Sequence, residues 1–246
     1  MREPLVQKGM IAADEGVVDG AAIIHFLMTP AALVEWSGGC VMVSYEQQLN
    51  RDPGWAFKEG SMHFEKESAV HKTLEKITRR LDELGIAYAV AGGMALFFHG
   101  YRRFTDDVDI LVTAQGLKEI HEKLEGLGYL PPFSGSKHLR DMEYGVKVEF
   151  LTAGDYPGDG KPKPVAFPDP SEVSTEIQGI RFLQLPSLLE LKLASGMTNP
   201  RRGQDLVDVQ KVIEALDLPE DFASKLNPFV RAKYKEIWQI IHTNPP

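Results

Sequence analysis

The sequence has little cysteine, little positive charge and no long apolar run, and each shortage narrows what the protein can be. Cys40 is the single cysteine, which excludes a disulfide framework and leads us to expect a reducing, cytoplasmic setting. Lysine and arginine number 27 against 35 aspartates and glutamates, and the formal net charge of −8 argues against coating nucleic acid through an overall field. The membrane-like segment at 21–34 is too short to span a bilayer and contains His25 and Pro30, so we expect no membrane association.

The chain divides into three stretches by pattern. Its 246 residues, 43% of them hydrophobic, are enough to bury a sizeable core in one or two domains. Residues 1–64 show weak periodicity and are expected to form an N-terminal extension of uncertain order. Residues 65–185 mix helical and strand patterns and predict an α/β core with a mixed sheet, and residues 186–246 predict a helical C-terminal region.

Periodicity and punctuation predict the individual elements. The helices are expected at 65–84, closed by Gly85, and at 94–99, 117–128, 187–196, 203–216 and 228–242. The strands are expected at 86–91, 107–112, 144–153 and 177–185, with a loop over 154–170. The Ser-x-x-Glu spacing of Ser187 and Glu190 is that of a capping box and predicts a helix beginning there.

Carboxylates gather on one face of the expected sheet. Side chains alternate along a strand, so Asp107 and Asp109 share the face opposite Val108 and Ile110. If the strand at 144–153 pairs with the strand at 107–112 and both turn their apolar faces to the core, Glu149 lies on the same face as Asp107 and Asp109. Three carboxylates on one surface suit a hard divalent cation such as Mg²⁺, whereas the plainer interpretation is a solvated sheet edge. Asp106 precedes the strand and is expected to point away and to be dispensable.

Two glycines, Gly92 and Gly93, follow the strand at 86–91 and open the next helix. A glycine turn lets backbone approach a phosphate closely, and the first turn of a helix offers free N–H groups. The plainer interpretation is a simple turn. An anion site beside a cation site would suit a nucleoside triphosphate with its metal.

The combination resembles a known signature. "GG", thirteen residues and then "DVDI" is similar to the pattern of the nucleotidyltransferase (polymerase-beta-like) superfamily, with a third acid on a later strand. The longer run "GGMALFFHGYRRFTDDVDI" resembles the AbiEii-type minimal nucleotidyltransferases, and so does the C-terminal run at 185–210. The matching residues of those later motifs are Lys192, Arg202, Asp205 and Asp208. Glu149 departs from the pattern, because aspartate is commoner there.

The resemblance implies a nucleotidyltransferase-type mixed sheet flanked by helices and a definite chemistry. A nucleoside monophosphate would pass from a nucleoside triphosphate to an acceptor, with two Mg²⁺ ions as cofactors and pyrophosphate released. The implied catalytic and metal-binding residues are Asp107, Asp109 and Glu149. The implied nucleotide-binding residues are Gly92, Gly93, Arg103, Thr105, Lys192 and Asp205.

Several of these residues have plainer roles as alternatives. Arg103 would pair with Asp106 or Asp107, Thr105 would cap the strand, and Lys192 would extend to solvent. Asp205 would pair with a surface cation instead of serving the site.

The acceptor is open at this level. One choice is RNA such as tRNA, in a toxin–antitoxin-like role with an antitoxin protein as partner. The other is a small molecule or a protein hydroxyl. The alternative to an enzyme is a catalytically inactive nucleotide- or partner-binding module on the same fold.

Overall fold

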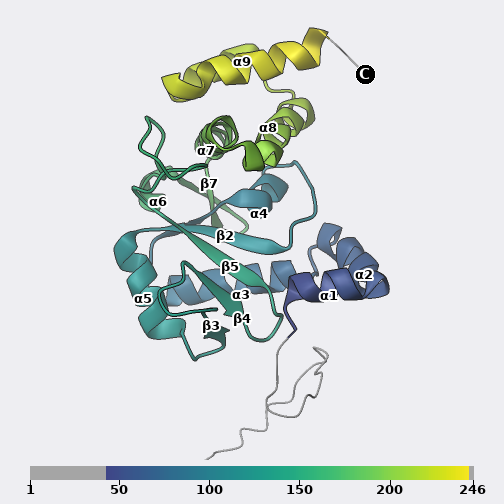
Figure 1. Ribbon diagram of the computed structural model, residues 1–246, viewed down its shortest axis with the longest axis vertical. Coiled ribbons are helices and arrows are strands. Elements are labelled where there is room, and N and C mark those ends of the chain that lie inside the picture. Colours follow the sequence, from purple (N-terminus) through teal and green to yellow (C-terminus); the bar gives the residue numbers. More distant parts are fainter. Residues whose placement is uncertain (1–42, 244–246) are drawn as a thin grey trace, which may run out of the picture. The chain divides into compact units, whose positions relative to one another are not determined.

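The computed structural model describes residues 43–243 (Figure 1). Cys40 and the apolar segment at 21–34 lie outside the described residues. Over residues 43–243, none of the helices combines the length and the apolar character that crossing a membrane requires.

The end of the expected N-terminal extension is helical. α1 (Tyr45–Arg51) and α2 (Pro53–Phe64) follow one another, each begun by a side-chain cap. Ser44 and Gln47 form a capping box on α1, and Asp52 accepts from the Trp55 N–H at the start of α2. These caps were not recognised from the sequence, because the stretch lacks a clear apolar period.

The expected helix at 65–84 is α3 (Ala69–Glu83), begun by Ser68. Its apolar stripe is buried, and Gly85 ends it with φ +67°. The Gly85 N–H donates to the Asp82 carbonyl and the Ile86 N–H to the Leu81 carbonyl, each at 3.0 Å. Glycine adopts this left-handed backbone without steric cost, so the helix stops where the sequence predicts.

The sheet has seven strands in the order β3-β4-β5-β2-β1-β7-β6. β2 pairs parallel with β5 and β1 parallel with β7, while the other neighbours are antiparallel. The strands are β1 (Tyr88–Val90), β2 (Asp107–Val112), β3 (Tyr129–Leu130), β4 (His138–Asp141), β5 (Lys147–Thr152), β6 (Ser174–Ile177) and β7 (Ile180–Leu183). The α/β architecture with a mixed sheet is confirmed.

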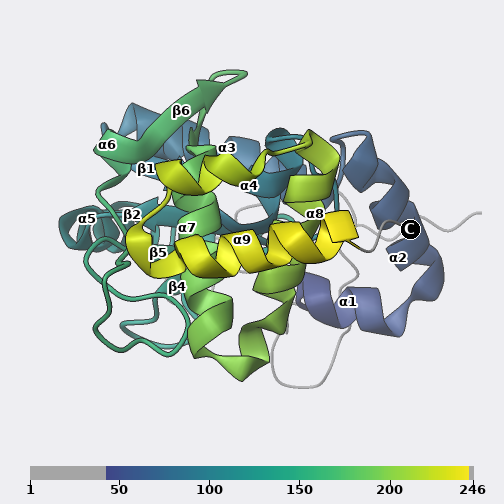
Figure 2. The ribbon, with the colours of Figure 1, turned by 90° about the horizontal axis from the view of Figure 1, so that it is seen from above.

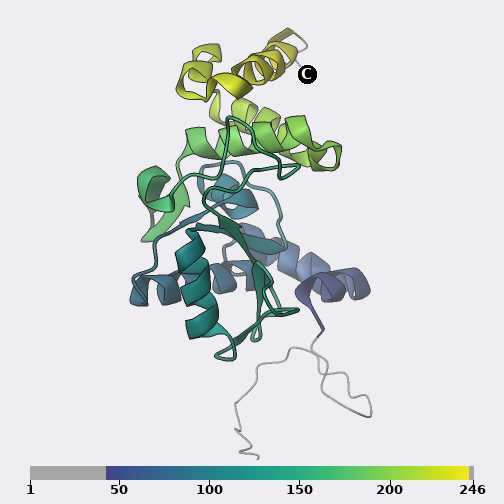
Figure 3. The same cartoon turned by 60° about the vertical axis from the view of Figure 1, so that its left-hand side comes forward.

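Helices surround the sheet and make up the C-terminal part. The remaining helices are α4 (Gly92–Phe98), α5 (Ala114–Leu124), α6 (Pro170–Val173), α7 (Leu185–Thr198), α8 (Gly203–Leu216) and α9 (Pro228–Thr243), with 3₁₀ turns at Pro200–Arg202 and Glu220–Lys225. Seen from above, α9 lies across α7 and α8 (Figure 2). α5 packs against the sheet at β5 (Figure 3). The helical C-terminal region is therefore confirmed.

Two expectations on single elements are wrong. The single strand expected at 177–185 is interrupted, because Gln178 and Gly179 both have positive φ and turn the chain between β6 and β7. Only Ile180–Leu183 form the second strand of this hairpin. The capping box at Ser187 does not form. α7 begins two residues earlier, at Leu185, since Pro186 fits the first turn of a helix, and Glu190 instead accepts from the Asn227 N–H.

β2 is buried along one face, as the alternation predicts, and its other face is open only at the acidic end, since Leu111 on that face is fully buried. Val108, Ile110 and Val112 are fully buried in the hydrophobic core, whereas Asp107 and Asp109 are half-buried on the other face. The strand therefore presents its acids to a partly enclosed space while it contributes to the core.

Candidate active site

The parallel register of β2 and β5 brings the expected acids together. Asp109 lies directly opposite Glu149, and Asp107 lies opposite Lys147. One carboxylate oxygen from each of Asp107, Asp109 and Glu149 lies within 4.8 Å of the others. Three hard oxygen ligands at this spacing fit a divalent cation such as Mg²⁺.

The electrostatics of this acidic triad favour a cation. Burial, followed by the charges of Asp107 and Glu149, raises the pKa of Asp109 to about 7. Three carboxylates this close repel one another, and a cation among them removes that repulsion. Protonation of Asp109 and a cation among the three acids would therefore each reduce the same repulsion.

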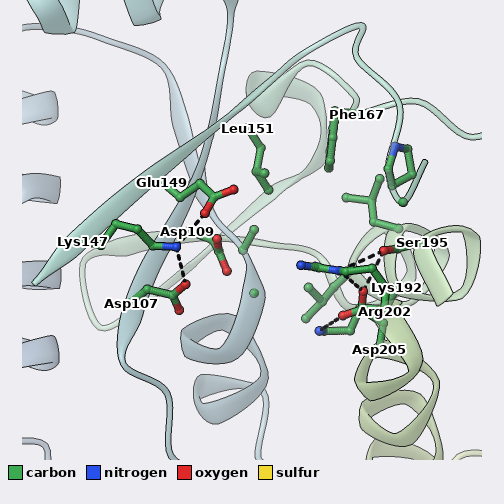
Figure 4. Close-up of a pocket in the computed structure, with 16 residues that line it drawn as sticks. Asp107, Asp109, Lys147, Glu149, Leu151, Phe167, Lys192, Ser195, Arg202 and Asp205 are labelled. Atoms are coloured by element: carbon green, nitrogen blue, oxygen red, sulfur yellow. Dashed lines mark hydrogen bonds and ion pairs between the residues drawn. The ribbon is translucent and has the colours of Figure 1, made fainter. Parts of the chain in front are cut away.

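Lys147 is the feature that the sequence interpretation missed. Its ammonium lies 2.9 Å from Glu149 Oε2 and 3.3 Å from Asp107 Oδ2 (Figure 4). Burial would lower the pKa of Lys147, but the two carboxylates outweigh it and hold that pKa above its usual value. The signal in the sequence is the period-two alternation, which puts Lys147 on the same face as Glu149.

Gly92 lets Asp109 take its position. It has φ +57°, and a Cβ built on it would lie 1.7 Å from Asp109 Oδ2. The Ala91 N–H donates to the Asp109 carbonyl at 2.9 Å, which holds the turn against β2. The first N–H groups of α4 have no partner within the helix, so they are available beside the acids.

Gly93 and Thr105 pack against each other behind this turn. A Cβ on Gly93 would lie 2.8 Å from the Thr105 side chain, and Thr105 Oγ1 donates to Asp107 Oδ1 at 3.0 Å. Thr105 is buried, so in this structure it orients an acid and does not line the cavity.

Lys192 lies across the cavity from the triad in a buried ion network of α7 and α8. Its ammonium donates to Asp205 Oδ1 at 2.9 Å and to Asp208 Oδ2 at 2.7 Å. Asp205 also accepts from Ser195 Oγ at 2.7 Å and from Arg202 Nε at 2.9 Å. Burial would raise the pKa of Asp205, but the charges and hydrogen bonds of Lys192, Ser195 and Arg202 together outweigh it and lower that pKa.

Arg103 belongs to the same network. Its Nη2 donates to Asp208 Oδ2 at 3.0 Å and its Nη1 to the Phe104 carbonyl at 3.0 Å. The acid that pairs with Arg103 is therefore on α8 and is neither Asp106 nor Asp107. The pairing ties the segment before β2 to the C-terminal helices.

A cavity of about 180 Å³ separates the acids from this network. The loop after β5 covers it, and its position is fixed at Gly158, where a Cβ would lie 2.7 Å from the Ser195 carbonyl and the backbone oxygen accepts from Asn199. Part of the wall is apolar, and the residues that form it are Leu151, Pro157, Phe167, Leu188 and Leu191. The cavity thus joins an acidic side, a cationic side and an apolar wall.

No family model and no curated protein matches the chain in sequence. Solved nucleotidyltransferase structures resemble it. ANT(2″)-Ia in complex with adenylyl-2″-tobramycin is 15% identical with a TM-score of 0.45, covering 68% of this chain and 97% of that one. The lincosamide antibiotic adenylyltransferase LnuA, bound to lincomycin, is 18% identical with a TM-score of 0.38, covering 57% and 94%.

A third similar structure is an antigenic nucleotidyltransferase-like protein from Paracoccidioides brasiliensis. It is 15% identical with a TM-score of 0.43, covering 71% of this chain and 88% of that one. At these identities the likeness concerns the fold alone, so the function has to come from the site's own chemistry.

Proposed function

We propose that the protein is a Mg²⁺-dependent nucleotidyltransferase, which transfers a nucleoside monophosphate from a nucleoside triphosphate to an acceptor and releases pyrophosphate. The observation that supports this most is the convergence of Asp107, Asp109 and Glu149 within 4.8 Å beside the Gly92 turn. A cation site next to free backbone N–H groups matches the two parts of a metal–triphosphate complex.

The three acids would hold the metal, and we expect two ions. When bound, Mg²⁺ neutralises phosphate charge and favours an in-line displacement. Thr105 orients Asp107 by a hydrogen bond, and Gly92, which has no Cβ, leaves the space that the Asp109 carboxylate occupies. Glu149 is the carboxylate that we assign to accept the proton of the acceptor hydroxyl.

The nucleotide would lie between the triad and α7. Backbone N–H groups of Gly92 and Gly93 would donate to phosphate oxygens, and Lys192 would contribute positive charge from the far side of the cavity. Asp205 holds that ammonium in place. Arg103 would contact the nucleotide only after leaving Asp208, so its proposed role depends on a rearrangement on binding.

Two acceptor classes remain as proposals. One is RNA such as tRNA, with a toxin-type role resembling the AbiEii group and an antitoxin partner. The other is a small molecule or a protein hydroxyl. Mass spectrometry of cellular RNA, metabolites and proteins after induced expression separates them, since the added mass identifies both the nucleotide and the acceptor. The single cysteine supports a cytoplasmic location for either.

The activity is tested with labelled nucleoside triphosphates, Mg²⁺ and these acceptor pools. The unaltered protein should form labelled product, Asp109→Asn should abolish it, and Asp106→Asn should leave it intact as the neighbouring control. If nucleotide binds but no acceptor is labelled, the inactive nucleotide- or partner-binding module is the better description. Absence of both metal and nucleotide binding overturns the proposal.

A further inference from the structure

The acidic triad already contains a cation that belongs to the chain. Lys147 begins β5 opposite Asp107 and precedes Glu149 by two residues, so its side chain rises from the same face as both acids. Its ammonium contacts Glu149 at 2.9 Å and Asp107 at 3.3 Å (Figure 4).

The position of Lys147 differs from that of an ordinary surface lysine. Lys147 lines the cavity and its side chain is 26% exposed, whereas Lys137, which pairs with Asp155, is 59% exposed. A surface pair such as the latter contributes little to stability, since water screens it. Lys147 instead contacts two half-buried acids that would otherwise repel each other.

The ammonium and a divalent cation would draw on the same two carboxylates, Asp107 and Glu149. Asp107 and Glu149 supply two of the three ligand atoms of the proposed metal site. Two positive charges among the same carboxylates repel each other, so a divalent cation bound there weakens the contacts of the ammonium with Asp107 and Glu149. Lys147 has a long flexible stem and can move its ammonium toward the cavity while its backbone stays in β5.

We propose that Lys147 is a tethered counter-ion of the triad: it holds Asp107 and Glu149 in place while no divalent cation is bound, and a binding cation must displace it. This inference rests on the proposed function to the extent that the latter puts a divalent cation among these acids. It adds a competitor built into the chain, which lowers the affinity of the site for metal and keeps the metal-free site intact.

The first test is titration calorimetry with Mn²⁺ and Mg²⁺ in the absence of nucleotide. The Lys147→Met side chain keeps the apolar stem but carries no charge. Because nothing then competes for the carboxylates, this variant should bind the cation at least about tenfold more tightly than the unaltered protein. Lys147→Arg should resemble the unaltered protein, and Lys137→Met is the matched control. In EDTA, Lys147→Met should have a lower unfolding temperature that Mn²⁺ restores. Unchanged or weaker cation binding by Lys147→Met overturns the inference.

The second test uses the unaltered chain and therefore does not depend on a variant folding. Amine acetylation followed by mass spectrometry measures the reactivity of each lysine. Lys147 should react slowly in EDTA and faster with Mg²⁺, whereas Lys137 should not change. A constant reactivity of Lys147 under conditions where Mg²⁺ is bound contradicts displacement.

The outcomes separate this inference from the proposed enzyme. If Asp109→Asn weakens cation binding but Lys147→Met leaves it unchanged, only the proposal that Lys147 is a counter-ion is overturned. Tighter binding by Lys147→Met without nucleotidyl transfer to any acceptor supports the counter-ion and overturns the enzyme. No cation binding by either protein overturns both.

Discussion

Gly92 is the residue of the site with least room for change, because backbone and packing both restrict it. In Gly92→Ala the new Cβ would lie 1.7 Å from Asp109 Oδ2 in a backbone with φ +57°, so Asp109 has to move. A displacement of about 1 Å in a catalytic group costs roughly 100-fold in rate. We expect a loss of that size in nucleotidyl transfer, measured in parallel with cation affinity.

Gly160→Ala is the matched control for this substitution. Gly160 also has a positive φ, of +72°, but a Cβ there meets nothing within 4 Å. It should therefore show the backbone strain of about 1–3 kcal/mol without the loss of activity. Equal losses in the two variants would mean that the contact with Asp109 is irrelevant.

Asp109 should make cation binding depend on pH. Its pKa is raised to about 7 by burial and by Asp107 and Glu149, so below that pH a cation has to displace a proton. The affinity for Mg²⁺ should therefore rise from pH 6 to pH 8, by up to about tenfold per unit below the pKa. Calorimetry in two buffers of different ionisation enthalpy should show proton release at pH 6.5, and a flat affinity would refute this.

The raised pKa of Asp109 also makes the stability of the ion-free protein depend on pH, in the opposite direction to the cation affinity. The pKa of Asp109 in the folded, ion-free protein lies above the value of about 3.9 expected when unfolded. The folded state then binds more protons between these values, so the ion-free protein should lose stability as the pH rises from about 4 to 7. Asp109→Asn should remove this loss in urea unfolding experiments at each pH.

At the scale of elements, Asp208 joins α7, α8 and the segment before β2. It is fully buried and accepts from Lys192 and Arg103. Asp208→Asn leaves two cations with one carboxylate fewer, and breaking a buried pair in this way costs about 3–5 kcal/mol. Urea unfolding should show this loss. Glu214→Gln, an exposed change on the same helix, should stay within about 0.5 kcal/mol.

The elements that could be predicted from sequence are those with a repeating pattern. The period-two alternation in β2 put Asp107 and Asp109 on one face, and the aligned core faces of β2 and β5 put Glu149 beside them, as the register confirms. The helical spacing of the apolar residues and the position of Gly85 likewise predicted α3. Local patterns suffice where one face of an element is buried.

The elements that were missed depend on contacts between distant residues. β3 and β4 are two and four residues long, too short for alternation to show. β4 forms where it pairs with β5, and β3 where it pairs with β4. α7 begins at Leu185 and not at Ser187 as expected, since a capping box is only one of several ways to begin a helix. Alternation places Lys147 on the acidic face, but no local pattern shows that its ammonium contacts Asp107, which lies forty residues away in the sequence.

At the scale of the whole molecule, ligand binding should link the sheet to the C-terminal helices. The cavity is lined from β2, β5, α7, α8 and the loop after β5, so a nucleotide bound there, as proposed, would join these elements. Ligand at about 100 times its dissociation constant stabilises the folded state by about 2.7 kcal/mol. For a chain of this length that corresponds to a rise in unfolding temperature of roughly 5–10 °C. Differential scanning fluorimetry with Mg²⁺ and each nucleoside triphosphate should show it, and Asp109→Asn should not.

The parallel pairing of β2 with β5 also determines when the site appears during folding. Two parallel neighbours cannot be joined by a tight turn, so the chain between Val112 and Lys147 has to cross over before Asp109 meets Glu149. Closing a loop of this length costs entropy before any contact repays it, which makes the pairing a late event. The ability to bind a divalent cation should therefore emerge only once β5 has paired with β2. A nascent chain that ends before β5 would contain Asp107 and Asp109 but lack Glu149, so the three-carboxylate site would be incomplete.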